Sequence, residues 1–447
     1  MKKISRLVTM KKILNVLILV FITAVSCTTK YNNMHSFETV WQTINDKHFD
    51  PSFGGLDWND VYNRYQPKIA AVEKNEEFYF LINKMLFELN LSHMFVLAPE
   101  DLSQLVPILA AEGSIGIDVR MLDNDAVITS VKSDSPGFQA GLRPGYIIQS
   151  IDGIKIEQIA DLKHINDIEY QNIDKETYKN FKVLVPPYNE RNRINNITNG
   201  ILKKINGPPD TVVSIMYVDE NGENQEKKIV RVQRSGKEFF FNEKMRPFLI
   251  EFEAKHLDDN IGYIRFNAFF PPADRKFREA ITSMYATDGL VIDIRGNPGG
   301  NNEIGQTIVK QLLKKPTLFN VFMYRDKKDE VILEPAEKAY LSPVVVLIDY
   351  LTGSSGERFA GCTQSIGRAL IVGEHSPGSV GPAKIEKLAN GAIFIYVYAQ
   401  TLTPDGKIIE GNGVIPDIEV KLDRNALLKG KDSQLEVALQ HIKNQIK

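Results

Sequence analysis

Apolar residues recur three or four positions apart over residues 36–99, a spacing that predicts amphipathic helices. They form two groups: Phe37, Val40, Trp41 and Ile44, then Phe78, Phe80, Leu81, Met85, Leu86 and Leu89. The segment Phe49–Trp58 between the groups is typical of a loop, and Asp57 is placed to cap a helix that begins near Trp58. We predict a small helical domain over residues 32–99.

Residues 100–235 instead show short apolar runs separated by turn signals, which predicts a β-rich unit. The runs are Ser114–Ile117 and Ala126–Val131, and later Thr211–Val218 and Lys227–Val232. Asn221-Gly222 lies between the last two and is a strong tight-turn signal, so these runs are expected to close the unit as a hairpin. Residues from about 158 to 209 then form an insertion rich in Asn, Lys and Tyr.

From residue 236 to residue 447, short apolar strands alternate with helical patterns, which predicts an α/β sheet. The candidate strands are Ile261–Phe266, Gly289–Ile294, Val344–Ile348, Ala369–Val372 and Ile393–Tyr398. The candidate helices are Asn302–Leu313, Ser355–Gln364 and the amphipathic tail Asp432–Ile446.

The first 27 residues have the pattern of a signal peptide, with basic residues ahead of an apolar run from Ile13 to Val25. The run is too short to span a bilayer. Ala24-Val25-Ser26-Cys27 resembles a bacterial lipobox, which predicts a lipid on Cys27. Ala24 stands where leucine is commoner, so cleavage by ordinary signal peptidase is the alternative, and translation could also begin at Met10.

Composition and charge narrow the function further. The 447 residues are 43% hydrophobic and 25% charged, as expected for two or three folded domains. Without residues 1–27, which hold five of the 54 Lys and Arg residues and no acidic residue, the net charge changes from −2 to −7. This charge argues against a nucleic-acid partner.

The cysteines and histidines predict neither a disulfide nor a metal site. If Cys27 carries lipid, Cys362 is the only thiol left, and we expect it to be a small buried hydrophobe. No spacing of His, Cys and carboxylate residues suits zinc or calcium. We therefore predict no metal and no cofactor.

Ser354 lies at the junction of a predicted buried strand and a predicted helix. The run Val344–Asp349 stops at a turn, and Thr352-Gly353-Ser354-Ser355-Gly356-Glu357 follows. Free backbone N–H groups at a helix start can hold an oxyanion, so Ser354 occupies the position of a nucleophile. The structural alternative is a capping box, because Ser354 and Glu357 have its spacing.

A second loop, Asp293–Asn301, also ends a strand and opens a helix. Its adjacent glycines, Gly299 and Gly300, allow backbone N–H groups to approach an anion or oxyanion closely. A plain tight turn is the alternative. A nucleotide site is disfavoured, because the spacing matches neither G-x-G-x-x-G nor a P-loop.

Part of the β-rich unit resembles a PDZ domain. The resemblance rests on Ser135-Pro136-Gly137-Phe138-Gln139-Ala140-Gly141-Leu142, then Pro144-Gly145 and Ile147-Ile148, with Tyr146 where aspartate is more usual. It implies that Ser114, Ile115, Gly116 and Ile117 form a loop that binds a peptide carboxylate.

Together the motifs resemble the carboxyl-terminal processing peptidases and tricorn-core serine peptidases. The matching segments are 293–300, Ser354–Glu357, Ala369–Glu374 and Glu410–Asp417, and they occur in the family's order. The resemblance covers nearly the whole chain after residue 27. It implies an α/β, ClpP/crotonase-like core with an N-terminal helical domain and an inserted PDZ-like domain.

The resemblance also implies roles for individual residues. Ser354 would be the nucleophile, and the N–H groups of Ser355 and of Gly299 or Gly300 would bind the oxyanion. In the Ser-Lys members a lysine follows the glycine of G-K-G-S-V-Q, but here Gly378–Ala383 places Ser379 at that position.

The missing lysine favours the tricorn-type arrangement. There His93 would be the general base, with Ser92 and Glu410 orienting its imidazole. Lys384 is a conceivable displaced base. His375 is expected in a loop that contacts substrate, and Asp293 and Asp417 are expected to be structural.

These expectations describe a serine endopeptidase that acts on polypeptides and is held by lipid at a bacterial envelope membrane, facing the periplasm or exterior. The alternative is a non-catalytic binder, since the architecture also resembles interphotoreceptor retinoid-binding proteins, which hold apolar ligands. The joint presence of Ser354, His93, Glu410 and the glycine loop favours the enzyme.

Overall fold

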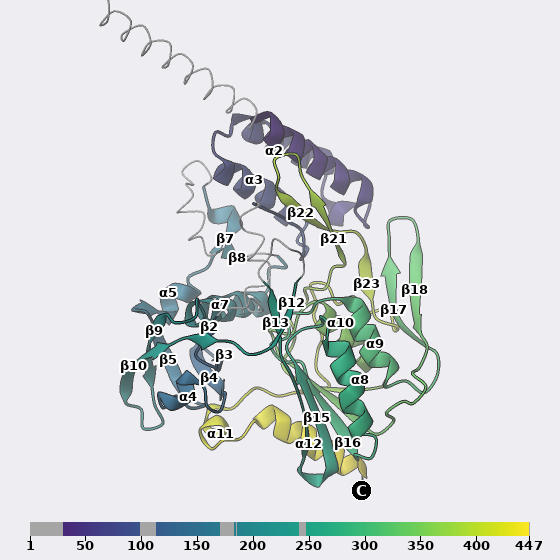
Figure 1. Ribbon diagram of the computed structural model, residues 1–447. Helices are drawn as coiled ribbons and strands as arrows, with labels where there is room; N and C mark the ends of the chain where they lie inside the picture. Colours follow the sequence, from purple (N-terminus) through teal and green to yellow (C-terminus); the bar gives the residue numbers. More distant parts are fainter. Residues whose placement is uncertain (1–29, 99–112, 170–182, 185, 241–246, 447) are drawn as a thin grey trace, which may run out of the picture.

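The computed structural model describes residues 30–98, 113–169, 183, 184, 186–240 and 247–446. The predicted signal segment and Cys27 lie outside the described residues. Figure 1 shows helices of the N-terminal part at one end, a β-rich unit on one side and a second sheet with flanking helices on the other. Within the described residues, no helix is long and apolar enough to cross a membrane.

The predicted N-terminal helices are present. Residues 30–47 are helical, and α2 (Trp58–Ala71) and α3 (Asn75–Phe87) follow. The Asp57 carboxylate accepts hydrogen bonds from the N–H groups of Asn59 and Asp60 at 3.0 and 3.1 Å, which confirms the predicted cap. The next strand, β1 (Phe95–Leu97), begins two residues after His93.

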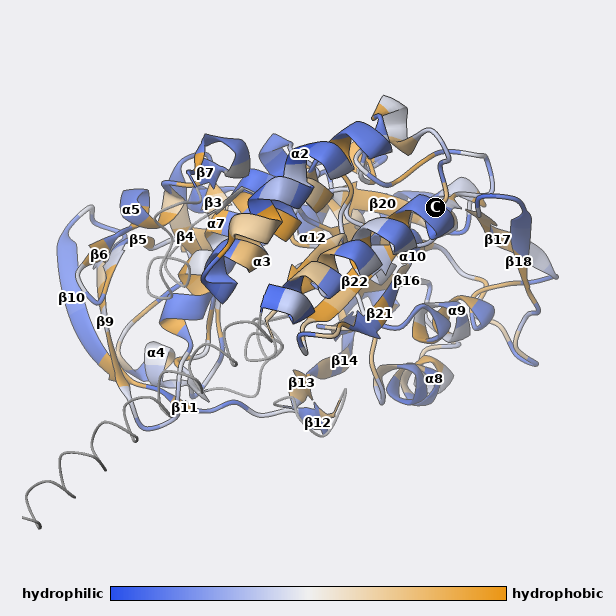
Figure 2. Cartoon of the chain, turned by 90° about the horizontal axis from the view of Figure 1, so that it is seen from above, coloured by the Kyte–Doolittle hydropathy of each residue, from blue (hydrophilic) through white to orange (hydrophobic). Residues whose placement is uncertain are grey.

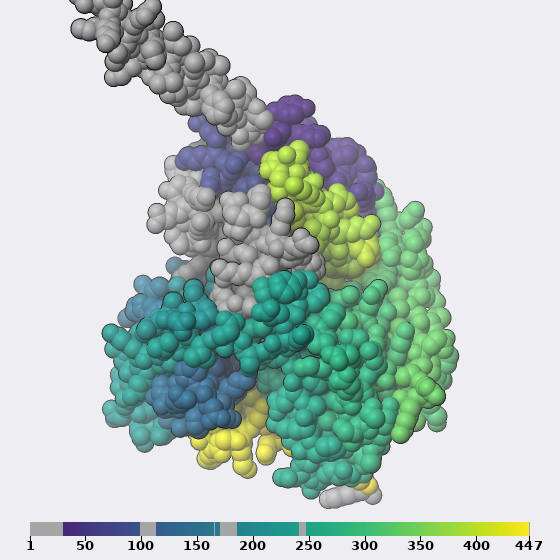
Figure 3. All heavy atoms as spheres, viewed as in Figure 1, coloured from purple at the N-terminus to yellow at the C-terminus, as the bar shows by residue number. Residues whose placement is uncertain are grey.

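Strand β22 (Ile393–Val397) differs from the prediction. We expected Ile393–Tyr398 in the α/β sheet, but β22 pairs with β1 and with β21 (Ala383–Lys387) in a separate three-stranded sheet. Its Phe394 and Tyr396 are buried in the same cluster as the N-terminal helices. In Figure 3 the yellow-green β21–β22 hairpin lies directly against the purple helices. The region that carries His93 is thereby attached to the C-terminal part.

The β-rich unit is an antiparallel sheet in the order β10-β9-β5-β4-β3. The strands in this order are β3 (Ile117–Leu122), β4 (Asp125–Val131), β5 (Ile147–Ile151), β9 (Val212–Val218) and β10 (Asn224–Val230), and β6 (Ile154–Lys155) also pairs with β5. The predicted β9–β10 hairpin is present, although β10 begins three residues earlier than expected. Figure 2 shows β10, an outer strand, as hydrophilic.

Helix α7 (Glu190–Ile205) lies within the predicted insertion and is part of the β-rich unit. Its Ile197, Ile201 and Ile205 are buried in the cluster that also holds Ile117 and Val119 of β3. Their spacing of four residues places them on one face of the helix. Helix α7 of the insertion therefore contributes to the hydrophobic core of the β-rich unit.

The α/β sheet of the C-terminal part has the order β14-β15-β16-β19-β20-β24. Its strands are β14 (Phe252–Leu257), β15 (Ile261–Phe266), β16 (Gly289–Asp293), β19 (Val344–Ile348), β20 (Leu370–Gly373) and β24 (Ile418–Glu419). Only β14 is antiparallel to its neighbour. All five residues of β19 are buried, as expected for a parallel strand covered on both faces.

Helices flank this sheet: α8 (Ala273–Ser283), α9 (Asn302–Lys310), α10 (Ser355–Ser365) and α12 (Ser433–Ile446). Helix α9 ends three residues before the predicted boundary. Helix α8 was not predicted, because only Ala273, Phe277 and Ile281 of this charged segment are buried. The carboxyl ends of β16 and β19 place the glycine loop and Ser354 side by side, since neighbouring parallel strands end at the same sheet edge.

Candidate active site

Ser354 occupies a strained turn between β19 and α10. Its φ of 50° and ψ of −116° lie in a region that residues other than glycine rarely adopt. The Ser354 N–H donates to the Ser379 carbonyl at 2.9 Å and to Glu357 Oε2 at 3.2 Å. The second bond is the Glu357 half of the predicted capping box. A strained serine at a strand-to-helix turn has the geometry of a nucleophile elbow.

The glycine loop lies against this turn. At Gly299 (φ 104°) an added Cβ would lie 2.6 Å from Ser354 Cβ, and at Gly300 (φ 141°) it would lie 2.5 Å from the Phe269 carbonyl oxygen. Both separations are shorter than any side chain tolerates. Glycine is therefore required at both positions for the loop to approach the serine.

The two glycine N–H groups are not equivalent. The Gly299 N–H donates to Asn297 Oδ1 at 2.9 Å, whereas the Gly300 and Ser355 N–H groups donate to no atom of the described chain. Ser355 Oγ lies 2.7 Å from the Gly300 carbonyl oxygen and 2.7 Å from Asn302 Oδ1, which ties the loop to the start of α10. Of the two predicted glycine donors, Gly300 is the one left free.

His93, Ser92 and Glu410 form a hydrogen-bonded chain. Ser92 Oγ lies 2.8 Å from His93 Nδ1 and donates to Glu410 Oε2 at 3.0 Å, while the Ser92 N–H donates to Glu410 Oε1 at 2.7 Å. Because the Ser92 hydroxyl proton is used toward Glu410, its oxygen accepts from His93 Nδ1–H. This fixes the tautomer in which His93 Nε2 carries the free lone pair.

The environment of His93 favours its neutral form. Burial lowers the pKa of His93 to about 4, and the positive charge of Arg358 acts in the same direction. Arg358 is almost fully buried on α10 and donates to the Val380 carbonyl and to Thr401 Oγ1, both at 3.2 Å. No sequence motif pointed to Arg358, since an arginine within a helix ordinarily lies at the surface.

Glu357 is fully buried and binds backbone N–H groups of residues near Ser354. Its carboxylate accepts from Ser376 Oγ and Gly378 N–H, both at 2.6 Å, from Ser379 N–H at 2.7 Å, and from Ser354 N–H. Burial raises the pKa of Glu357 to about 7, and these hydrogen bonds oppose the rise. Sequence analysis expected only the contact with the helix start.

The Glu410 carboxylate binds the N–H groups of Val380 and Gly381, which directly follow Ser379 in the chain. Its Oε2 accepts from the N–H groups of Val380 and Gly381 at 2.7 and 2.8 Å. Burial raises its pKa, and the hydrogen bonds again act in the other direction. Residues 376–381, which we call the catalytic segment, therefore connect the carboxylate beside Ser354 with the carboxylate behind Ser92 and His93.

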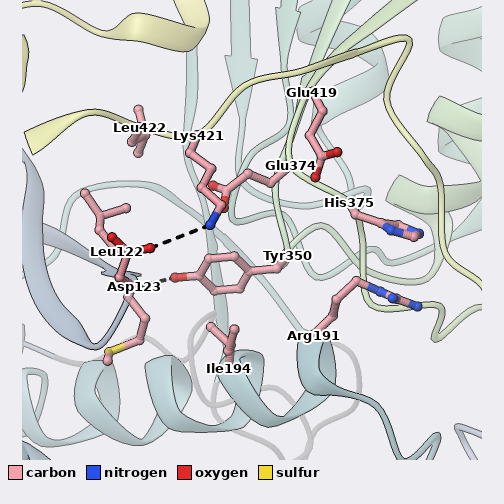
Figure 4. A pocket seen from close by; sticks show the side chains of 11 residues that line it. Leu122, Asp123, Arg191, Ile194, Tyr350, Glu374, His375, Glu419, Lys421 and Leu422 are labelled. Atoms are coloured by element: carbon pink, nitrogen blue, oxygen red, sulfur yellow. Dashed lines mark hydrogen bonds and ion pairs between the residues drawn. The ribbon is translucent and has the colours of Figure 1, made fainter.

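Lys384, Cys362 and His375, the other residues considered as bases, nucleophiles or substrate contacts, do not take part in the hydrogen-bonded chain of His93. Lys384 is exposed, and its Nζ lies 5.0 Å from the ring centroid of Tyr398. Cys362 is fully buried, and burial raises the pKa of its thiol to about 12, as expected for an inert cysteine. His375 Nε2 lies 2.7 Å from the Asn412 carbonyl oxygen, and its ring lines a pocket beside Arg191 (Figure 4).

Asp293 and Asp417 make structural contacts. Asp293 accepts from the Arg295 guanidinium and from Tyr263 Oη, and Asp417 accepts from the Ile371 N–H at 2.7 Å. Arg295 and Tyr263 hold the end of β16 next to the glycine loop. Neither carboxylate contacts Ser354 or His93 among the described residues.

The loop predicted to bind a carboxylate lies ahead of β3, the outer strand of the β-rich sheet. Gly116 has a φ of 78°, and its N–H donates to Ser114 Oγ at 3.1 Å. Ile115 is fully buried, and its carbonyl accepts from the Gly137 N–H at 2.8 Å. Ser114–Ile117 is thus a fixed turn between β2 (Gly113–Ser114) and β3 (Ile117–Leu122).

Comparison with known families agrees with this architecture. Residues 260–420 match the model of peptidase family S41. The core domain belongs to peptidase family S41. Residues 30–87 match the tricorn protease C1 domain, and residues 113–168 match the PDZ domain. S41 peptidases are serine hydrolases, so the chain is a serine peptidase.

Curated relatives of this S41 peptidase are processing proteases. The chain is 24% identical over 383 residues to the carboxyl-terminal-processing protease of Synechocystis sp., covering 84% of this chain and 78% of that protein. It is 27% identical over 319 residues to the carboxy-terminal processing protease CtpB of Bacillus subtilis, covering 69% and 55%. The chain is thus similar to carboxyl-terminal processing proteases over most of its length.

Solved structures share the fold. The photosystem II D1 C-terminal processing protease superposes with a TM-score of 0.54 at 20% identity, covering 89% of this chain and 96% of that one. At this identity the likeness concerns the fold alone. In the described part of the chain, no group of three or more His, Cys, Asp and Glu residues is arranged to hold a metal ion.

The low pKa of His93 predicts the pH dependence of hydrolysis. If His93 is the general base, it must be neutral to act, so activity would be lost as the pH falls through the pKa of His93. We expect the acid limb of kcat/KM to have its midpoint below 6.5, the ordinary value for histidine. The measurement is kcat/KM on a peptide substrate from pH 4 to pH 9. A midpoint near 7 would instead assign the limb to Glu357.

Proposed function

We propose that this peptidase is an endopeptidase in which Ser354 is the nucleophile and His93 is the general base. The observation that carries the proposal is the chain from Glu410 through Ser92 to His93, which fixes the imidazole tautomer. A protein that only binds a ligand has no need of a buried carboxylate behind a histidine. Ser379, at the position of the Ser-Lys lysine, supplies no base.

The proposed reaction begins when Ser354 Oγ attacks the scissile carbonyl carbon and His93 Nε2 takes the hydroxyl proton. The negative charge that develops on the carbonyl oxygen is stabilised by the free N–H groups of Ser355 and Gly300. Collapse of the tetrahedral intermediate breaks the C–N bond, and His93 returns its proton to the leaving amine. Water then hydrolyses the acyl-enzyme, with His93 again as base.

Glu410 supports the charged form of His93 during this cycle. The imidazolium that forms is stabilised by the carboxylate through the Ser92 hydroxyl, much as the third residue of a triad stabilises its histidine. In the structure His93 Nε2 and Ser354 Oγ are not hydrogen-bonded to each other. Such a bond is often long without substrate and shortens in the Michaelis complex.

The PDZ domain is proposed to dock the free C-terminus or an extended segment of the substrate. Because β3 is the outer strand of its sheet, a peptide can add to it by β-augmentation, and the Ser114–Ile117 turn lies where the peptide carboxylate would end. The PDZ match at residues 113–168 supports this role. It would present the polypeptide to Ser354 for cleavage.

Replacement of the catalytic groups tests the mechanism. We expect Ser354→Ala and His93→Ala each to lower kcat on an unfolded polypeptide by at least about 10³-fold, because the pair acts as a unit. Lys384→Ala is the matched control and should retain activity within about threefold. A fluorophosphonate probe should label the wild type and not Ser354→Ala. Loss of activity in Lys384→Ala with retention in His93→Ala would contradict the assignment of the base.

We also propose that the protein is anchored by lipid on Cys27 at a bacterial envelope membrane. The support is the signal pattern of residues 1–27 and the small residues that precede Cys27. Cells fed a labelled fatty acid should incorporate it into the wild type and not into Cys27→Ser. Equal labelling of both proteins would show that Cys27 is not the site.

A further inference from the structure

The start of α7 touches both halves of the catalytic machinery. The Tyr188 N–H donates to Asn90 Oδ1 at 3.2 Å, two residues before Ser92. Asn189 Nδ2 and Asn192 Nδ2 each donate to the Pro377 carbonyl oxygen at 3.2 Å, within the catalytic segment. Residues 188–192 therefore lie between the loop that carries His93 and the backbone that holds Ser354.

Arg191 makes the most extensive of these contacts. Its Nε donates to the Ser376 carbonyl at 2.8 Å, and its Nη2 donates to the carbonyls of Asn412 at 3.0 Å and Gly411 at 3.3 Å. Figure 4 shows Arg191 rising from α7 beside His375, which contacts the same Asn412 carbonyl. The guanidinium thus joins the start of the catalytic segment to the residues directly after Glu410.

Each of these carbonyls belongs to a backbone that places a catalytic group. Ser376 precedes Gly378 and Ser379, which bind Glu357, while Gly411 and Asn412 follow Glu410. The Gly411 N–H also donates to the Gly378 carbonyl at 2.8 Å, so the two segments are already in contact. Arg191 is the cation that spans them, and the rigid fork of its guanidinium fixes their separation.

We propose that Arg191 is a positioning residue for peptide hydrolysis. It acts through the catalytic segment and the residues after Glu410, and it does not touch the substrate. The inference rests on the proposed roles of Ser354, His93 and Glu410. Arg191 lies outside the residues that match the three family models. The proposed positioning role therefore belongs to the insertion at about residues 158–209.

Replacing Arg191 with alanine should affect turnover more than substrate binding. Three carbonyl oxygens lose a donor, and the segment between Glu357 and Glu410 loses its fixed position. A misplacement of about 1 Å at a reacting group costs roughly 10²-fold. We expect Arg191→Ala to lower kcat about 10-fold to 100-fold, with KM for a short peptide changed less than about threefold.

Arg193 provides the matched control on the same helix. It pairs with Glu190 at 2.8 Å on the surface, and 39% of its side chain is exposed. Arg193→Ala removes the same charge and side chain, and we expect its kcat to stay within about twofold of wild type. Equal kcat values for Arg191→Ala and Arg193→Ala would overturn the inference.

A second variant separates positioning from loss of the fold. Arg191→Lys keeps the charge but lacks the fork, so we expect an intermediate kcat and the wild-type midpoint of urea unfolding. If Arg191→Lys matches wild type in kcat, the inference is wrong. The rate of Ser354 labelling by fluorophosphonate should fall in parallel with kcat. Wild-type protein that shows no Ser354-dependent labelling would contradict the proposed function itself, whatever Arg191 does.

Discussion

Two buried carboxylates hold one short stretch of backbone, and the rest of the site depends on this arrangement. Four consecutive N–H groups, from Gly378 to Gly381, donate to Glu357 and then to Glu410 at 2.6–2.8 Å. Glu357 also binds the N–H of Ser354, and Glu410 binds Ser92. The catalytic segment thereby connects Ser354, the proposed nucleophile, with Ser92 and His93, the proposed base, through the main chain.

The two buried glutamates and the N–H groups that they bind depend on one another. Burial raises the pKa of both glutamates, and the charge of Glu410 raises that of Glu357 further. The hydrogen bonds that oppose this rise come largely from the catalytic segment, so loss of either partner leaves buried groups unpaired. The Ser379 carbonyl also accepts from the Ser354 N–H. At the position where Ser-Lys peptidases carry the base, the backbone of this chain binds the proposed nucleophile, Ser354.

The parts of the site that the sequence predicted are local in the chain. Ser354 at its strand end, the adjacent glycines, Ser92-His93 and Glu410 each stand in a short motif. The structure joins Ser92, His93 and Glu410 by hydrogen bonds and places Gly299 against Ser354. What could not be predicted depends on distant partners. Arg191 donates to the Ser376 carbonyl, 185 positions away in the sequence, and β22 pairs with β1 in a separate sheet beside the N-terminal helices. The spacing of residues within a short motif gives no information about contacts between segments that are far apart in the sequence.

The most direct test of this account is a crystal structure of the protein with Ser354 trapped by a phosphonate. The adduct stands in for the tetrahedral intermediate, with its phosphoryl oxygen in place of the oxyanion. We expect this oxygen within hydrogen-bond distance of the Ser355 and Gly300 N–H groups, and His93 Nε2 within about 3.2 Å of an oxygen on the phosphorus. An adduct in which His93 stays beyond the reach of a hydrogen bond and a lysine approaches instead would contradict the account.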